Sequence, residues 1–268
     1  MYFVTDKCWF LMSFAICAGR IIIDVLNLLD QLETLRRLDP KYRVFGASRH
    51  RYQLNAPTCP KVLAEFEVRH SVSLPSDYCT YMTQVSNGGA GPNYGLIEIE
   101  RAALGHIPSL PFPVHEVDNT PDGSIFEGNR IPGAIWLSDN GCCTFDILVV
   151  KGRHAGSVWT VLENDHGHCC QSFHAWYCGW LKSAIRTLER EPFLSTLRPG
   201  MHIDEIRAVF GDEIVPVADN EKSVGYIVAF CDCNAVFRFN SNDQLLGVKH
   251  HAHVICPSMN SFKGTQPC

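Results

Sequence analysis

The side chains best suited to bind a metal ion are concentrated between residues 163 and 174. They are two acids, three histidines and two cysteines, at Glu163, Asp165, His166, His168, Cys169, Cys170 and His174. Histidine, thiolate and carboxylate groups all bind zinc, and two histidines separated by one residue can do so from a strand. However, no second ligand pair stands at a familiar zinc spacing, and the tract at residues 250–256 is no clearer. We therefore expect local structure here, with zinc as the alternative, and no cofactor.

The thirteen cysteines form an odd-numbered set without a CxxC pair, which argues against a zinc ribbon or a thioredoxin-like motif. Cys142 and Cys143 are adjacent inside an apolar run, where a free cysteine packs as a small hydrophobic residue. The sequence therefore predicts reduced, partly buried thiols and a cytoplasmic location.

A cysteine hydrolase would need a thiolate, a positioned histidine and a third group that orients the histidine. With thirteen cysteines and twelve histidines, many such pairs arise by chance. The chain contains no GxSxG, Walker, dinucleotide-binding or HExxH motif. We therefore expect no enzymatic activity and no catalytic residue, and keep a Cys/His-dependent hydrolase as an alternative.

The composition of the 268 residues is typical of a globular protein, with 46% hydrophobic and 19% charged residues. A net charge of −5 argues against direct nucleic-acid binding by bulk electrostatics. Residues 1–20 form an apolar lead-in whose uncharged run is too short to span a bilayer, so no membrane association is expected.

Helical spacing of apolar residues predicts helices over residues 21–38, 60–70 and 173–188, and a further helix that begins at Leu74-Pro75-Ser76-Asp77. Residues 41–55 are expected to form a loop. The aromatic stripe of the long helix, from Phe173 to Trp180, is interpreted as core.

Strands are expected at residues 94–99, 134–138, 142–150 and 157–162. Asn140-Gly141 is the expected hairpin turn between the second and third of these, because both residues tolerate positive φ. Beyond Glu191-Pro192, a short helix precedes strands at residues 224–230, 235–239 and 245–248. The predicted fold class is α+β, with a mainly antiparallel sheet packed with helices in residues 21–191. A small domain, a helix followed by an antiparallel meander, is expected in residues 192–268.

The segment Leu74-Pro75-Ser76-Asp77-Tyr78, followed by Asn-Gly-Gly-Ala-Gly-Pro-Asn-Tyr-Gly-Leu at residues 87–96, resembles the SUKH superfamily. This superfamily groups bacterial immunity proteins of toxin systems with fungal regulators of cell-wall synthesis. Further similar segments occur in the order found in the family, at residues 45–55 before this stretch and at residues 136–142, 156–159 and 176–181 after it, so that the resemblance covers residues 25–190.

The resemblance implies an α+β fold without an established catalytic site. It also implies an immunity protein that neutralises a protein toxin, often a nuclease or another nucleic-acid-modifying enzyme, by binding it. A regulatory interaction scaffold of the cell-wall-regulator type is the alternative.

Two groups of residues are the candidates for this binding function. The glycine-rich loop after the helix that begins at Leu74 is interpreted as a tight structural turn or a partner-contacting loop, at Asn87, Gly88, Gly89, Gly91, Pro92, Tyr94 and Gly95. Residues 95–146 hold eight acids and only two arginines. An acidic face would favour association with a basic toxin, with partner contacts expected at Glu98, Glu100, Glu116, Asp118, Asp122, Glu127 and Asp139. The alternative to this binding face is a solvated loop. The eighth acid in residues 95–146 is Asp146.

Overall fold

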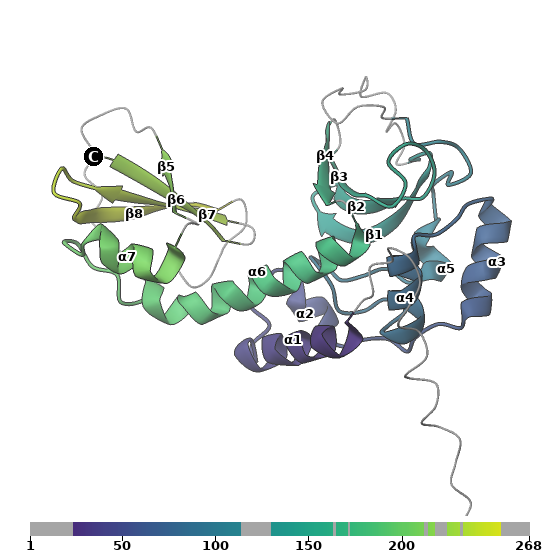
Figure 1. Ribbon diagram of the computed structural model, residues 1–268, viewed down its shortest axis with the longest axis horizontal. Helices are drawn as coiled ribbons and strands as arrows, with labels where there is room; N and C mark the ends of the chain where they lie inside the picture. Colours follow the sequence, from purple (N-terminus) through teal and green to yellow (C-terminus); the bar gives the residue numbers. More distant parts are fainter. Residues whose placement is uncertain are drawn as a thin grey trace, which may run out of the picture.

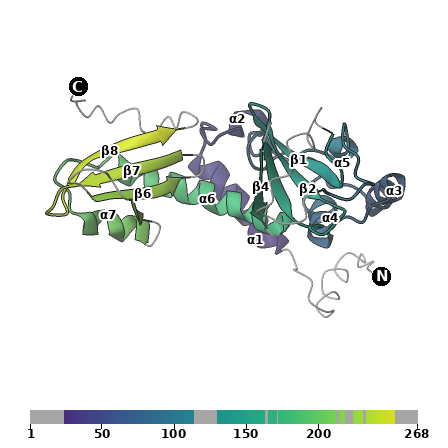
Figure 2. The same cartoon turned by 90° about the horizontal axis from the view of Figure 1, so that it is seen from above.

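The computed structural model describes residues 24–113, 130–162, 165–170, 172–211, 214–217, 224–230 and 233–252. These residues form two four-stranded antiparallel sheets and seven helices, which confirms the predicted α+β class. The first sheet carries most of the helices, and the long helix α6 leads from it to the second sheet (Figure 1). Seen from above, the two sheets lie toward opposite ends of α6 (Figure 2).

The first part of the chain builds its sheet from four consecutive strands, β1 (Ala134–Gly141), β2 (Thr144–Val149), β3 (Val158–Leu162) and β4 (Asp165–Cys170). Its helices are α1 (Val25–Leu38), α2 (Ala47–His50), α3 (Pro60–His70), α4 (Ser76–Gln84), α5 (Ile99–Ala102) and α6 (Phe173–Leu194). The helices expected over residues 60–70 and from residues 76 and 173 onward are therefore confirmed. Several elements differ from the prediction: α2 interrupts the loop expected at residues 41–55, residues 94–99 do not form a strand, and α5 and β4 were not expected.

Alternating side chains of β1 contribute to two separate hydrophobic cores. Ile135 and Leu137 pack in the core that includes the helices, whereas Ala134 and Trp136 belong to the core on the other side, with Phe112. This alternation follows from the two-residue period of a strand. The sheet is therefore buried on both faces.

The aromatic stripe of α6 lies in the larger core, as the sequence predicts. Phe173, Tyr177 and Leu181 are fully buried, and Phe173 packs edge-on against Tyr78 with ring centroids 5.1 Å apart. The carboxylate of Asp77 accepts hydrogen bonds from the backbone N–H of Tyr78 and from that of His174, each at 2.9 Å. One buried carboxylate thus joins the first turns of α4 and α6, where the helix dipoles favour negative charge.

The hairpin between β1 and β2 turns two residues later than expected. Gly141 pairs with Thr144, so that Cys142 and Cys143 occupy the turn, with φ of 49° and 61°. Both cysteines are exposed, so the prediction that this pair is buried was wrong. Contacts of the preceding residues with the glycine-rich loop, described below, move the turn away from Asn140-Gly141.

The C-terminal part contains α7 (Ile203–Phe210) and the strands β5 (Ile214–Val217), β6 (Val224–Phe230), β7 (Cys233–Phe239) and β8 (Leu245–Ala252). The strands form a meander, as predicted. The sequence did not predict the first of these strands, β5. Helix α6 continues through Pro192, the expected domain boundary. Nevertheless, α6 passes from one hydrophobic core to the other close to Pro192, because Leu188 packs against the core of the first part and Phe193 against that of the C-terminal part.

None of the helices in the described ranges is both long enough and apolar enough to cross a membrane.

Asp77→Ala is expected to lower the free energy of unfolding by about 2–3 kcal/mol, because it leaves the buried N–H of Tyr78 and the partly buried N–H of His174 without this acceptor. Asp204→Ala is the matched control, since Asp204 also lies in the first turn of a helix but its side chain is 75% exposed. The control is expected to cost less than about 1 kcal/mol. Urea denaturation measures both, and equal losses would contradict this role of Asp77.

Candidate binding groove

The glycine-rich loop extends the first sheet beyond β1 by a row of single bridges. Leu54 pairs with Gly89, Gly89 with Leu96, and Leu96 with Ser138 of β1, all antiparallel. We call these four residues the bridge row. Three short segments from distant parts of the sequence thereby lie side by side next to β1.

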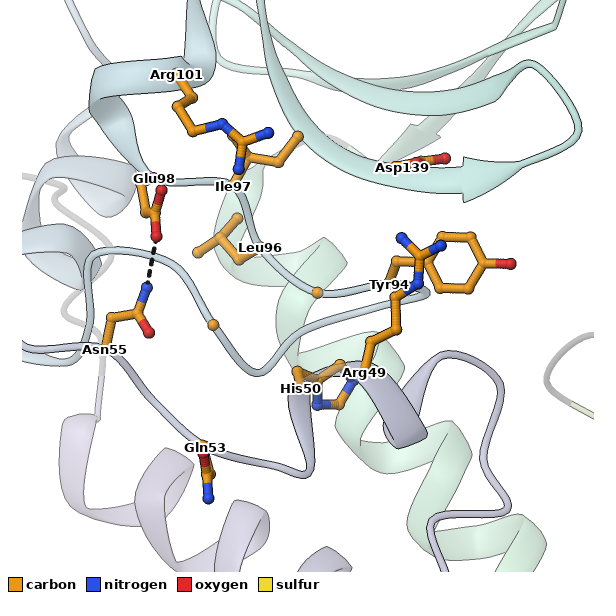
Figure 3. A pocket seen from close by; sticks show the side chains of 12 residues that line it. Arg49, His50, Gln53, Asn55, Tyr94, Leu96, Ile97, Glu98, Arg101 and Asp139 are labelled. Atoms are coloured by element: carbon orange, nitrogen blue, oxygen red, sulfur yellow. Dashed lines mark hydrogen bonds between the residues drawn. The ribbon is translucent and has the colours of Figure 1, made fainter.

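A groove of about 390 Å³ opens over the bridge row (Figure 3). Helix α2 contributes Arg49 and His50, and the segment that follows it contributes Gln53 and Asn55. The remaining lining consists of Gly89, residues 94–98, Arg101 of α5 and Asp139 of β1. The groove therefore draws its polar groups from four separate stretches of the chain.

The glycines of the loop are required by close backbone packing. Gly89 has φ of +93°, and a β-carbon there would lie 2.5 Å from the carbonyl oxygen of Gln53. Gly95 has φ of +101°, and its β-carbon would lie 2.5 Å from the carbonyl oxygen of Gly89. Both distances are too short for non-bonded atoms. Only glycine fits at these positions, and its missing side chain leaves space above the floor of the groove.

The polar residues of the loop also hold the extension together. Asn87 accepts a hydrogen bond at Oδ1 from the N–H of Ile99, which starts α5, and its carbonyl oxygen accepts one from Asn55. The carbonyl oxygen of Pro92 accepts a hydrogen bond of 2.8 Å from Ser138 Oγ. These hydrogen bonds thus fix the predicted loop, from Asn87 to Gly95, to the neighbouring segments and to β1.

Tyr94 anchors one end of the groove. The guanidinium carbon of Arg49 lies 4.0 Å from the centroid of the Tyr94 ring, and Phe45 packs on the same ring at 5.2 Å. A cation above an aromatic face is attracted by the ring quadrupole, so this contact holds the arginine in place. Among the described residues, neither Arg49 nor Arg101 forms an ion pair, and both line the groove.

Three of the predicted partner-binding acids lie in or next to the groove. Glu98 accepts a hydrogen bond of 3.1 Å from Asn55 Nδ2, and Glu100 one of 2.9 Å from Asn87 Nδ2. Asp139 is exposed at the opposite end and accepts a hydrogen bond from the N–H of Gly141. The four other acids, at Glu116, Asp118, Asp122 and Glu127, lie outside the described residues.

Asp146 does not belong to an acidic surface, although it was counted with the other acids in the sequence. It is only 4% exposed. Its carboxylate accepts hydrogen bonds from Thr160 Oγ1 at 2.7 Å, Trp176 Nε1 at 3.2 Å and Asn93 Nδ2 at 3.3 Å. Burial raises the pKa of Asp146, and the hydrogen bonds from Thr160 and Trp176 oppose the rise. Asp146 therefore connects the sheet, α6 and the glycine-rich loop from inside.

His50 lies at the buried wall of the groove and is 9% exposed. Its Nδ1 accepts a hydrogen bond from the N–H of Tyr52, so the ring proton is on Nε2. Nε2 makes no hydrogen bond of good geometry within the described part, although the backbone of Asn93 lies close enough to favour the protonated ring. Burial outweighs that effect and lowers the pKa of His50 to about 4, so the imidazole is neutral at neutral pH.

Arg49, His50 and Arg101 were not predicted as site residues. Arg49 and His50 fall in a stretch that was expected to be a loop, and Arg101 stood out only as an exception among acids. Their sequence spacing carries no signal, because the bridge row alone brings them to one groove.

Two of the described thiols, those of Cys79 and Cys178, lack the lowered pKa of a catalytic cysteine. Cys178 Sγ lies 3.6 Å from His174 Nδ1, but burial raises the pKa of Cys178, with an opposing effect of Lys182. Burial also raises the pKa of Cys79, to about 11. An activated thiol instead needs a lowered pKa. Among the side chains that the structure describes, which do not include those of residues 162–171, no three His, Cys, Asp or Glu side chains are grouped closely enough to hold a metal ion.

Gly89→Ala is expected to reduce the free energy of unfolding by at least about 2 kcal/mol, because it combines an unfavourable φ with a backbone overlap. Gly156→Ala is the matched control, since Gly156 has φ of +97° but no atom within 4 Å of the place that a β-carbon would occupy. Urea denaturation of both variants separates the cost of the unfavourable φ from the cost of the backbone overlap. A control as unstable as Gly89→Ala would show that φ alone, and not close packing, requires glycine.

The protein is expected to lose stability as the pH falls from about 6.5 to about 4 and to show no such change above that window. Burial lowers the pKa of both His50 and His106 to about 4, so the unfolded chain binds protons there before the folded chain does. The full loss is up to about 3 kcal/mol for each histidine. Denaturation at a series of pH values measures it, and the double variant His50→Gln/His106→Gln is expected to flatten the curve; an unchanged slope would contradict this.

Comparison with protein-family models, with curated proteins and with solved structures finds no match for this chain.

Proposed function

We propose that this chain is a non-catalytic binding protein of the SUKH type, which neutralises a protein toxin by occupying it. The observation that carries the proposal is the groove over the bridge row, in which the stacked pair of Arg49 and Tyr94 faces open space. Tyrosine and arginine are the residue types most often responsible for binding energy in protein interfaces. A guanidinium that is already held on a ring loses little freedom when a partner binds.

The charges of the groove are suited to a protein segment rather than to a small ion. Arg101 and Glu98 stand toward one end, and Arg49 and Asp139 toward the other (Figure 3). Each end thus offers both signs of charge, so a bound segment can find a complementary charged group at either end. The acids at Glu98 and Glu100 retain exposure after their single asparagine hydrogen bonds, so they can still attract a basic toxin.

The state of the titratable groups supports binding without chemistry. Asp77 and Asp146 are engaged in structural hydrogen bonds, His50 is neutral and buried, and Cys178 is not activated toward the thiolate. The contact between Cys178 and His174 is the observation that favours the hydrolase alternative. The raised pKa of that thiol weighs against it, since the thiolate is the nucleophile.

Co-expression with the toxin encoded by the neighbouring gene is expected to restore growth and to yield a complex. Arg49→Ala is expected to weaken the complex by about 2 kcal/mol, close to thirtyfold in Kd, because it removes a central anchor. Arg69→Ala is the control, since Arg69 is exposed on α3 and does not line the groove. Calorimetry measures the affinities.

Absence of both protection and complex would contradict the proposed function. A complex that Arg49→Ala and Arg69→Ala weaken equally would place the interface elsewhere.

A further inference from the structure

The tip of the β1–β2 hairpin presents two adjacent thiols to solvent. Cys142 and Cys143 are both exposed and form the two-residue connection between paired Gly141 and Thr144. No part of the proposed binding function uses them. We call them the tip pair.

The tip pair adopts a conformation that cysteine does not favour. Both residues have positive φ, as a two-residue hairpin turn of the favoured type requires, and Asn-Gly is the usual sequence for such a turn. Asn140-Gly141 directly precedes the pair, so the preferred turn sequence was available immediately before it in the chain. A residue keeps a sparsely populated backbone conformation only where the surrounding structure enforces that conformation. Such residues cluster at functional sites.

Contacts with the glycine-rich loop hold the residues before the tip pair. Asn93 Nδ2 donates a hydrogen bond of 2.6 Å to Asn140 Oδ1, and the N–H of Gly141 donates one of 2.8 Å to Asp139. A β-carbon at Gly141 would lie 3.2 Å from the ring of Tyr94. The hairpin is therefore fixed up to Gly141, and the two thiols project beyond this anchored base.

The geometry of neighbouring residues disfavours a direct disulfide within the tip pair. Consecutive Cα atoms are about 3.8 Å apart, below the range of about 4.4–6.8 Å that disulfides normally span. A larger soft atom placed between the two sulfurs relieves this constraint, because it adds a member to the ring and forms longer bonds. The pair is thus better arranged to share one thiophilic atom than to oxidise.

We propose that the tip pair is a dithiol site for a trivalent organoarsenical. In the reaction, the two arsenic–hydroxyl bonds of R–As(OH)₂ break and two arsenic–sulfur bonds form. Each hydroxyl leaves with one thiol proton as water, and arsenic keeps its oxidation state, so that no oxidant or reductant is needed. Both cysteines are required, because a single thiolate is readily displaced by other thiols in solution.

The other described thiols provide internal controls. Cys59 is exposed but has no cysteine beside it in the sequence, and Cys79 and Cys178 are half-buried. Cys169 and Cys170 are also adjacent, but they lie in the strand β4 rather than in a turn. The site is therefore assigned to the turn and not simply to neighbouring cysteines.

The test is native mass spectrometry of the full chain treated with phenylarsine oxide in the presence of excess glutathione. We expect one equivalent of arsenical that Cys142→Ser and Cys143→Ser each remove, and that Cys59→Ser and the double variant Cys169→Ser/Cys170→Ser retain. Circular dichroism checks that the variants are folded, and peptide mapping locates the arsenic. An unmodified wild-type chain, or an equivalent that survives Cys142→Ser, would overturn the proposal. The result does not depend on the existence of a toxin partner.

Discussion

The close packing of backbone at Gly89 and Gly95 is the constraint on which the rest of this region depends. A β-carbon at either residue would overlap a carbonyl oxygen at 2.5 Å, so the bridge row can form only with glycine at both positions. The bridge row in turn places residues near 54, 89 and 96 beside β1. Without this close packing of the three segments beside β1, the charged residues that line the groove would lie on separate parts of the surface.

Buried carboxylates then connect the elements around the extension. Asp77 joins the first turns of α4 and α6, and Asp146 joins β2 and β3 to α6 and to the glycine-rich loop. Asp39 acts similarly near α2: it accepts hydrogen bonds from two backbone N–H groups and from the hydroxyl of Tyr52. A buried carboxylate with several donors is well satisfied, and its removal leaves donors unpaired. These acids stabilise the scaffold, and the exposed acids and arginines of the groove are the residues that we propose for recognition.

Elements with local signals could be predicted from the sequence, whereas those fixed by distant contacts could not. Helix α3 has the predicted bounds, because Pro60 suits the first helical turn and the apolar spacing is regular. The expected strand at residues 94–99 fails because Asn87 caps the N–H of Ile99 and starts α5. The hairpin turn is displaced because Asn93 and Tyr94 engage Asn140 and Gly141. Likewise, Arg49 and Arg101 become groove residues only through the tertiary fold, and no sequence spacing announces them.

The groove over the bridge row is the surface that we propose to bind a protein partner. Hydrogen–deuterium exchange of the chain, free and in complex with the proposed toxin partner, tests this most directly. We expect protection of residues 49–55 and 94–101 on binding, with no change in α7. Protection confined to α7 and the second sheet, with unchanged exchange along the groove, would contradict the proposed surface.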